Sequence, residues 1–268
     1  MSLFHPDTQA LIDRLQHASP QSLLISGHEG VGLLAVAHAV AEGSQLTIVS
    51  PDESKASRPI TTEAIRQLYD ATRSKSIKRQ SVVVDEADRM TRGAQAAFLK
   101  LLEEPNASVY FILTSSRPDV LLPTIRSRVQ QSVISPITLE QSEAYLTEHG
   151  VTDATLRRQL LYLAEGLPEE LIRLISDKTY FDDAVQRMQD ARELLQSPLY
   201  EKLLTINGYK DNRGRAEQLL TAAIRMTRRS LSQHPQKASI IQLEKLLDAS
   251  EQLNANANVR LTLTQLVI

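Results

Sequence analysis

The chain has 268 residues, 42% of them hydrophobic and 23% charged, which is the composition of a folded protein and not of a disordered one. Lys and Arg total 30 against 32 Asp and Glu, so the formal net charge is −2, and charge alone does not favour tight autonomous nucleic-acid binding. The absence of Cys excludes a disulfide framework and a cysteine-ligated zinc site, and it is typical of a protein in a reducing cytoplasm. No apolar run approaches the roughly 18 residues that cross a bilayer. We therefore expect a cytoplasmic protein without a membrane partner.

Five short apolar runs alternate with helical stretches up to about residue 135. They cover residues 22–26, 46–49, 81–84, 109–113 and, more weakly, 132–134. Continuous apolar runs of this length are typical of strands buried on both faces of a parallel sheet, and the segments between them are long enough for crossover helices. Residues 1–135 therefore read as a doubly wound α/β domain.

One helix stands out in this first half. Apolar residues recur every three or four positions from Ala94 to Leu102, and Pro105 is expected to end the helix. After Pro136 the strand signals stop, and Thr138 followed by Gln141 predicts a capped helix start.

Helical spacing then continues to the end of the chain. The expected breaks are Gly166, Asn207–Gly208 and Gln233–Pro235. We expect a small helical domain over 136–180 and a helical C-terminal domain over 181–268.

A glycine-rich loop follows the first predicted strand. Gly27, Gly30 and Gly32 have the spacing of a phosphate-binding P-loop, in which converging backbone N–H groups leave no room for a Cβ. The alternative is an ordinary strand-to-helix turn. The groups that grip a triphosphate are missing, however, because Leu33 replaces the lysine and Leu34 the magnesium-ligating hydroxyl. We expect no nucleotide hydrolysis and weak or absent nucleotide binding by this chain.

The third predicted strand ends in an acidic pair, Asp85 and Glu86. This is the form of a Walker B strand, in which the aspartate orders magnesium and the glutamate activates water. A buried strand that happens to end in acids is the alternative. Residues 85–88 also spell a helicase box, but that class needs two ATPase lobes and an intact P-loop lysine, so we set it aside.

The residues around this strand resemble those of a known family. Residues 85–91 and 94–105, then Phe111–Ser116 and Leu122–Arg128, are similar in order and content to the clamp-loader branch of the AAA+ ATPases. They correspond to the Walker B strand, its following helix, the sensor 1 strand and the Ser-Arg-Cys motif. The match is good over about 20–135, weakens through the small helical domain, and returns at 246–261. It implies a five-stranded parallel sheet flanked by helices, a helical lid at 136–180 and a helical collar for oligomerisation at 181–268.

Within this family the combination of motifs resembles the delta-prime subunits. Motor subunits keep the P-loop lysine, whereas delta-prime, a rigid stator, often lacks it and keeps the motif arginine. The sequence departs from the pattern of these subunits in two places. Many bacterial relatives carry a four-cysteine zinc module before the Walker B strand, but 46–80 contain no Cys, so no zinc is expected. Val129 replaces the cysteine of the Ser-Arg-Cys motif, with little consequence expected, because the chemistry belongs to the guanidinium.

The resemblance implies roles for individual residues. Arg128, in a motif with Ser127, would be an arginine finger offered in trans to ATP on a neighbouring motor subunit, since its planar, permanently charged fork suits a transferred phosphoryl group. Taken alone, an ordinary surface arginine beside Arg126 would be the simpler interpretation. Thr114, at the sensor 1 position, is expected to satisfy backbone groups at the strand end. Glu169 and Glu170 lie where active relatives place a cationic sensor 2, and would repel phosphate.

The resulting hypothesis is a non-hydrolysing subunit of the bacterial DNA polymerase III clamp loader. Its implied partners are the motor (gamma/tau) and delta subunits and, through the complex, the sliding clamp and primed DNA; ATP and magnesium would belong to the motor subunit. An ATP-hydrolysing AAA+ remodeller or helicase loader with an atypical P-loop, and a regulatory ATPase relic without a clamp partner, are the alternatives. A basic cluster, Arg225, Arg228 and Arg229, is usually a solvated helix face and is otherwise a contact with a subunit or DNA.

Overall fold

The computed structural model describes residues 3–18, 20–52, 58–72, 79–104 and 106–267, and the chain divides into two compact units, residues 1–174 and 175–268. Each unit is described by itself. The predicted boundary at 135/136 lies within the first unit, and that at 180/181 in the first turn of α9 (Lys178–Gln196), so the finer three-part division stays a prediction.

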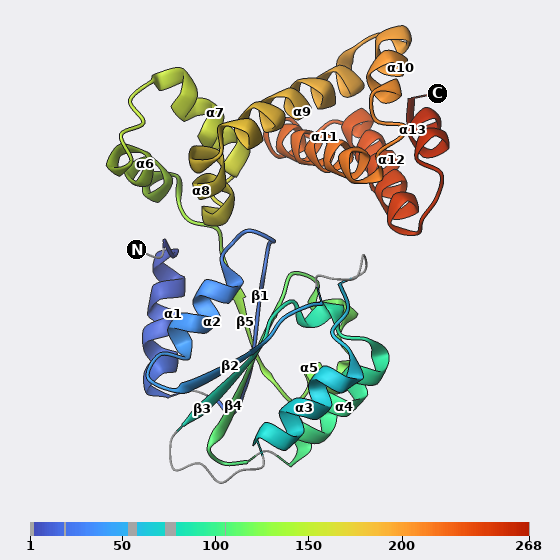
Figure 1. The fold of residues 1–268 in the computed structure, drawn as a ribbon. Helices are drawn as coiled ribbons and strands as arrows, with labels where there is room; N and C mark the ends of the chain where they lie inside the picture. Colours follow the sequence, from blue (N-terminus) through green and yellow to red (C-terminus); the bar gives the residue numbers. More distant parts are fainter. Residues whose placement is uncertain (1–2, 19, 53–57, 73–78, 105, 268) are drawn as a thin grey trace. The chain divides into compact units, whose positions relative to one another are not determined.

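The first unit is built on a five-stranded, all-parallel sheet in the order β2-β3-β4-β1-β5 (Figure 1). All five predicted strands are present, each within two residues of its predicted start. Their bounds are β1 Ser22–Gly27, β2 Gln45–Val49, β3 Gln80–Val84, β4 Val109–Ser115 and β5 Gln130–Ile134.

Burial differs between the central and the edge strands. Strands β1, β3 and β4 are almost wholly buried, as expected of strands covered on both faces. The expectation fails at the two edges, where Ile48 of β2 is 41% exposed and Val133 of β5 is 76% exposed. Both residues lie on the edge strands of the sheet, which have a neighbour on one side only.

Helices cover both faces of the sheet (Figure 1). One face carries α1 and α2 over a core that includes Leu23, Ile25 and Val36, and the other carries α3, α4 and α5 over a core that includes Phe98 and Phe111. The bounds are α1 Pro6–His17, α2 Leu33–Val40, α3 Thr62–Thr72, α4 Arg92–Glu103 and α5 Pro123–Arg126, with 3₁₀ turns η1 Ala87–Arg89 and η2 Pro118–Val120.

The helix predicted over 94–102 is α4. Thr91 caps it by accepting a hydrogen bond from the Ala94 N–H, and its buried face includes Phe98, whose ring meets Phe111 edge-on with centroids 5.4 Å apart. The helix ends at Glu103, and the predicted stop, Pro105, lies outside the described residues.

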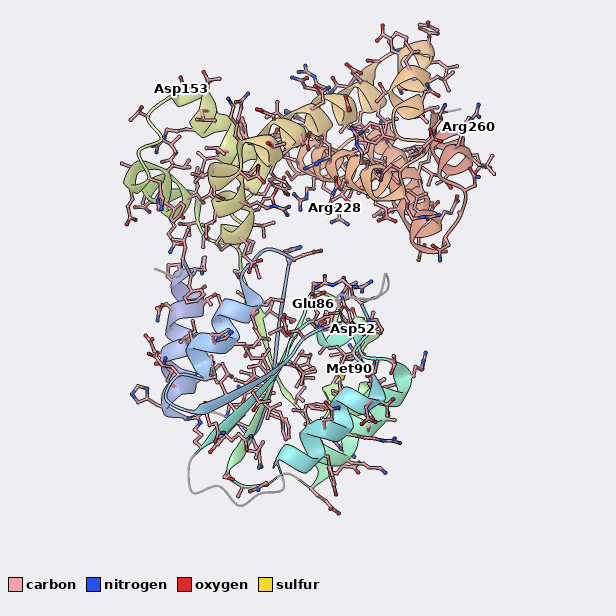
Figure 2. The ribbon with its side chains drawn as sticks, in the orientation of Figure 1. Asp52, Glu86, Met90, Asp153, Arg228 and Arg260 are labelled. Carbon is pink, nitrogen blue, oxygen red and sulfur yellow. The ribbon has the colours of Figure 1, made fainter. Side chains whose placement is uncertain are left out.

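Three further helices follow, α6 Leu139–Glu148, α7 Ala154–Ala164 and α8 Pro168–Ser176, the last of which crosses the boundary of the first unit at residue 174. The predicted start of α6 is confirmed, because Thr138 and Gln141 form a reciprocal capping box. Asp153 caps α7 (Figure 2) by accepting a hydrogen bond from the Leu156 N–H. The break at Gly166 is also present, with φ +77°.

The second unit consists of five helices among the described residues: α9, α10 Leu199–Asn207, α11 Arg213–Gln233, α12 Lys237–Asn254 and α13 Val259–Val267. The predicted breaks at 207–208 and 233–235 fall between them. The fully buried face of α11, with Leu219, Leu220 and Ala223, packs between α9 and α12. Arg213 joins α11 to the end of α12 by donating to the carbonyl oxygens of Leu253 and Ala257.

None of the described helices combines the length and the apolar composition that crossing a membrane requires.

Candidate functional site

The glycine-rich loop contains two residues with left-handed backbone conformation. It connects the end of β1 to the start of α2, and Gly30 and Gly32 have φ of +83° and +88°, the left-handed region that favours glycine. Gly27 lies against β5, since a Cβ there would come within 2.9 Å of the Ile134 carbonyl oxygen. The loop therefore lies between a strand and a helix, as the glycine spacing predicts, and its similarity to a phosphate-binding loop stays a prediction.

The two residues that replace the lysine and the hydroxyl of a P-loop are part of the apolar core. Leu33 and Leu34, in the first turn of α2, are partly buried and pack against the core on the α1–α2 face of the sheet. Neither side chain can donate a hydrogen bond to a phosphate or coordinate a cation.

A carboxylate from α8 lies beside the loop. The backbone N–H of Glu169 donates to the Gly30 carbonyl oxygen at 3.2 Å. The side-chain Oε1 of Glu169 lies 4.0 Å from the position that a Cβ on Gly32 would take. Burial raises the pKa of Glu169, and the charges of Asp85 and Glu29 raise it further. The charges of Asp85 and Glu29 are therefore felt by the Glu169 carboxylate that lies beside the loop.

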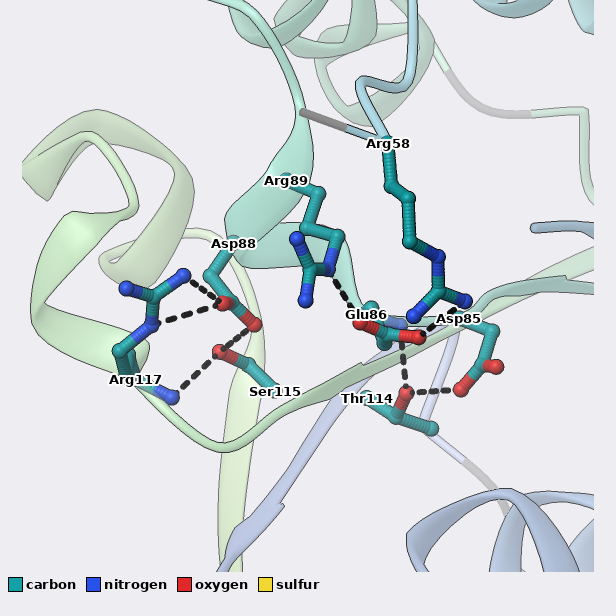
Figure 3. A network of polar contacts seen from close by, with 8 residues as sticks. All are labelled: Arg58, Asp85, Glu86, Asp88, Arg89, Thr114, Ser115 and Arg117. Atoms are coloured by element: carbon teal, nitrogen blue, oxygen red, sulfur yellow. Dashed lines mark hydrogen bonds and ion pairs between the residues drawn. The ribbon is translucent and has the colours of Figure 1, made fainter. Parts of the chain in front are cut away.

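The acidic pair after β3 is engaged by its own chain (Figure 3). The Thr114 hydroxyl, at the end of β4, donates to Asp85 Oδ1 at 2.6 Å and accepts from the Glu86 N–H at 3.0 Å. Thr114 thus satisfies a backbone group, as expected, and also holds the Asp85 carboxylate.

Both carboxylate oxygens of Glu86 are occupied by guanidinium groups (Figure 3). Arg58 donates to Oε1 at 3.1 Å, and the Nε of Arg89 donates to Oε2. Glu86 itself has φ +46°. Both oxygens of this carboxylate are therefore already engaged by charge-assisted hydrogen bonds within the chain.

A buried acid anchors the same turn (Figure 3). Asp88, 8% exposed, accepts from the Ser115 hydroxyl at 2.8 Å and from Nε and an Nη of Arg117 at 3.1 and 3.0 Å. This network joins η1 to the end of β4 and fixes the backbone that carries Asp85 and Glu86.

Arg128 lies just after the short helix α5. Ile125 and Val129 are buried, which anchors the turn, while Ser127 and Arg128 are exposed. The Arg128 guanidinium donates to the Thr124 carbonyl oxygen at 3.1 Å and forms an ion pair of 3.1 Å with Glu103 at the end of α4. The Ser127 hydroxyl donates to the same carbonyl oxygen.

Strand register separates Arg128 from the glycine-rich loop. Gln130, at the start of β5, pairs with Leu23 at the start of β1, whereas Ile134 pairs with Gly27. At roughly 3.3 Å per residue, the four steps from Gln130 to Ile134 span about 13 Å, and Arg128 precedes Gln130. Arg128 and the loop therefore lie at opposite ends of the sheet.

The turn that carries Arg128 is held by a buried glutamine of α4. Gln95, 3% exposed, accepts from the Leu122 N–H at 2.8 Å and donates to the Met90 carbonyl oxygen at 3.3 Å. Sequence reasoning missed Gln95, as well as Arg58 and Glu103, because no local pattern marks a partner that is distant along the chain.

The basic residues of the second unit have separate roles. Arg213 is a structural tie to α12, and Arg215 lies over the ring of Tyr209 at 5.2 Å from its centroid. Arg228, on α11, is exposed (Figure 2), as is Arg229, whereas Arg225 is partly buried. Over the described part of the chain, no three His, Cys, Asp or Glu side chains are grouped to hold a metal ion.

Comparison with known proteins agrees with the family indicated by the motifs. Residues 41–138 match the family model described as DNA polymerase III, delta subunit. The chain is 32% identical over 130 residues to DNA polymerase III subunit delta' of Pseudomonas aeruginosa, a match covering 47% of this chain and 39% of the relative. It is 29% identical over 165 residues to the delta' subunit of Bacillus subtilis, covering 52% and 48%. These matches span less than half the length of either relative.

The fold agrees as well. A DNA polymerase III gamma-subunit-related protein of Thermotoga maritima superposes with a TM-score of 0.52 and 20% identity over 97% of both chains. The predicted AAA+ fold, a five-stranded parallel sheet with flanking helices and a helical C-terminal part, is confirmed.

Proposed function

This chain resembles the delta-prime subunits of the bacterial DNA polymerase III clamp loader, and we propose that it is a stator-like clamp-loader subunit without ATPase activity of its own. In this proposal it joins a ring of AAA+ subunits and supplies Arg128 in trans to ATP on a neighbour. The observation that carries the proposal is the difference between the two ends of its sheet. At one end the glycine-rich loop carries apolar and acidic side chains, and at the other end Arg128 is exposed.

The first part of the proposal is that the glycine-rich loop binds no triphosphate. Leu33 and Leu34 remove the cation and the metal ligand, and each lost charge-assisted hydrogen bond costs about 1.5–3 kcal/mol. Glu169 adds a carboxylate beside the loop, so a phosphate would meet repulsion as well. Glu86, which would activate water, is paired with Arg58 and Arg89.

The second part is that Arg128 serves a neighbouring subunit. Its ion pair with Glu103 joins side chains that are 41% and 51% exposed, and pairs of this kind are worth about 0.2–1 kcal/mol. Arginine fingers in other phosphoryl-transfer enzymes contribute a factor of about 10³–10⁵ in rate, which corresponds to about 4–7 kcal/mol and is much larger than the free energy of this ion pair. Arg128 can therefore leave Glu103 when a neighbour's phosphates are presented.

The partners follow from the family. We propose that the chain assembles with motor (gamma/tau) and delta subunits through residues 181–268, and acts on the sliding clamp and primed DNA only through that complex, in the cytoplasm. ATP and magnesium then belong to the motor subunit, and the chain needs neither a bound nucleotide nor zinc.

An ATP-hydrolysing remodeller or helicase loader is the alternative, and calorimetry separates the two. Mg-ATP is titrated into the isolated chain, with the motor subunit of the same bacterium as the binding control. The proposal predicts heat of binding for the motor subunit and none for this chain, together with co-purification of the two. Tight Mg-ATP binding by this chain would reject the stator role in favour of an active ATPase.

A further inference from the structure

Helix α10 presents an unusual amount of apolar surface. Leu199, Tyr200, Leu203 and Leu204 are 52%, 73%, 39% and 56% exposed. At about 100° per residue they lie within one arc of the helix, opposite the side on which Thr205 donates to Glu193 of α9. Ile206, 3% exposed, anchors the helix in the core of the second unit. Exposed Leu and Tyr side chains gathered on one helix face are typical of a protein contact surface.

A pocket of about 520 Å³ adjoins this face. Leu204 belongs to both, since it is exposed on the α10 arc and also lines the pocket. The pocket walls come from α9, α10, the turn after α10 and the start of α11, and consist of Asp190, Glu193, Glu201, Leu204, Thr205, Gly208, Tyr209 and Arg215.

The pocket is negatively charged. Three of its lining residues are carboxylates and one is a guanidinium, Arg215, which lies over the Tyr209 ring. Two of these carboxylates accept hydrogen bonds from neutral hydroxyl groups. The Tyr209 hydroxyl donates to Asp190, and the Thr205 hydroxyl donates to Glu193 at 2.9 Å. Burial raises the pKa of Tyr209, and the adjacent Asp190 raises it further. These neutral donors orient the carboxylates without cancelling their charge.

We propose that this surface, named here the α10 surface (Leu199, Tyr200, Leu203, Leu204 and the adjoining pocket), docks an amphipathic helix of another clamp-loader subunit. The apolar side of that helix covers the four exposed side chains, and an Arg or Lys enters the pocket to pair with Glu193 and Glu201. Charge complementarity selects this occupant, because the pocket would repel a phosphate backbone or an anionic membrane. The inference rests on the proposed function and adds the face and the chemistry of the partner.

The test uses the full chain and the purified motor and delta subunits of the same bacterium. Leu204→Asp places a charge in the apolar face, and Glu201→Lys reverses a charge of the pocket; both residues are exposed, so the fold should survive, as a thermal melt will verify. The matched controls are Ile241→Asp, 48% exposed on α12, and Glu251→Lys, also exposed on α12. Affinity is measured by surface plasmon resonance.

The proposal predicts that Leu204→Asp and Glu201→Lys each weaken binding by at least about tenfold, while both controls bind like the unmodified chain. Normal binding by the two α10 variants, or equal losses in the controls, would overturn the inference and leave the proposed function standing. Failure of the unmodified chain to bind either subunit would reject the proposed function and this inference with it. Self-association of the chain that Leu204→Asp abolishes would assign the surface to a second copy instead.

Discussion

Replacing Gln95 by Ala tests whether the turn that carries Arg128 depends on α4. The buried Gln95 side chain bonds the Leu122 N–H at 2.8 Å and the Met90 carbonyl oxygen at 3.3 Å. Alanine leaves both backbone groups without this partner, and each unsatisfied group costs about 1–3 kcal/mol, so the first unit should lose about 2–6 kcal/mol.

Gln131→Ala is the matched control. Gln131 also bonds this turn, donating to the Arg126 carbonyl oxygen at 3.2 Å, but the contact is exposed, so its loss should change the free energy of unfolding by less than about 0.5 kcal/mol. Urea unfolding followed by circular dichroism measures both variants. In the reconstituted complex Gln95→Ala should also lower the ATPase rate, because Arg128 loses its support. Equal stability of the two variants would refute the assignment of Gln95 as the anchor.

Two further predictions concern the contacts of α8 and the preceding turn. Glu169→Gln should be more stable than the unmodified chain at pH 8, because a carboxyl whose pKa is raised in the folded state opposes folding when it is ionised. The advantage of the variant should shrink as pH falls through the raised pKa and vanish below the ordinary value of 4.5. Urea midpoints at pH 4 and pH 8 measure it, and a less stable variant at pH 8 would contradict the reasoning. Gly166→Ala should destabilise the first unit more than Gly150→Ala. Both glycines have positive φ, so alanine adds about 1–2 kcal/mol of strain at either position, but only at Gly166 does a Cβ meet a backbone atom, the Ile137 oxygen at 2.6 Å. Equal melting temperatures of the two variants would show that the turn at Gly166 moves to make room for the Cβ.

The sheet was predictable from sequence because its signals are local. A short apolar run between helical stretches indicates a strand wherever it lies in the sheet, and the glycines of 27–32 indicate a turn with positive φ. Strand order is not a local property, and for that reason the exposure of Ile48 and Val133 at the two edges was not foreseen.

The candidate site was predictable where a motif carries it and not where two distant side chains meet. Asp85, Glu86 and Arg128 were found from position within motifs. Their partners Arg58 and Glu103 were not, because long charged side chains on unrelated elements pair only once the fold brings them together. Glu169 was expected to repel phosphate at the sensor 2 position, and the structure adds its bond to the Gly30 carbonyl oxygen.

The most direct test of the central claim is the ATPase rate of the reconstituted clamp loader with Arg128 changed. Arg128→Ala should assemble normally and lower the rate, and Arg128→Lys should recover little of it, because a point charge lacks the planar fork of the guanidinium. The matched control is Arg126→Ala, which removes a neighbouring arginine paired with Asp119 at 2.6 Å and should leave the rate unchanged. An unchanged rate for Arg128→Ala in the assembled complex would contradict the account.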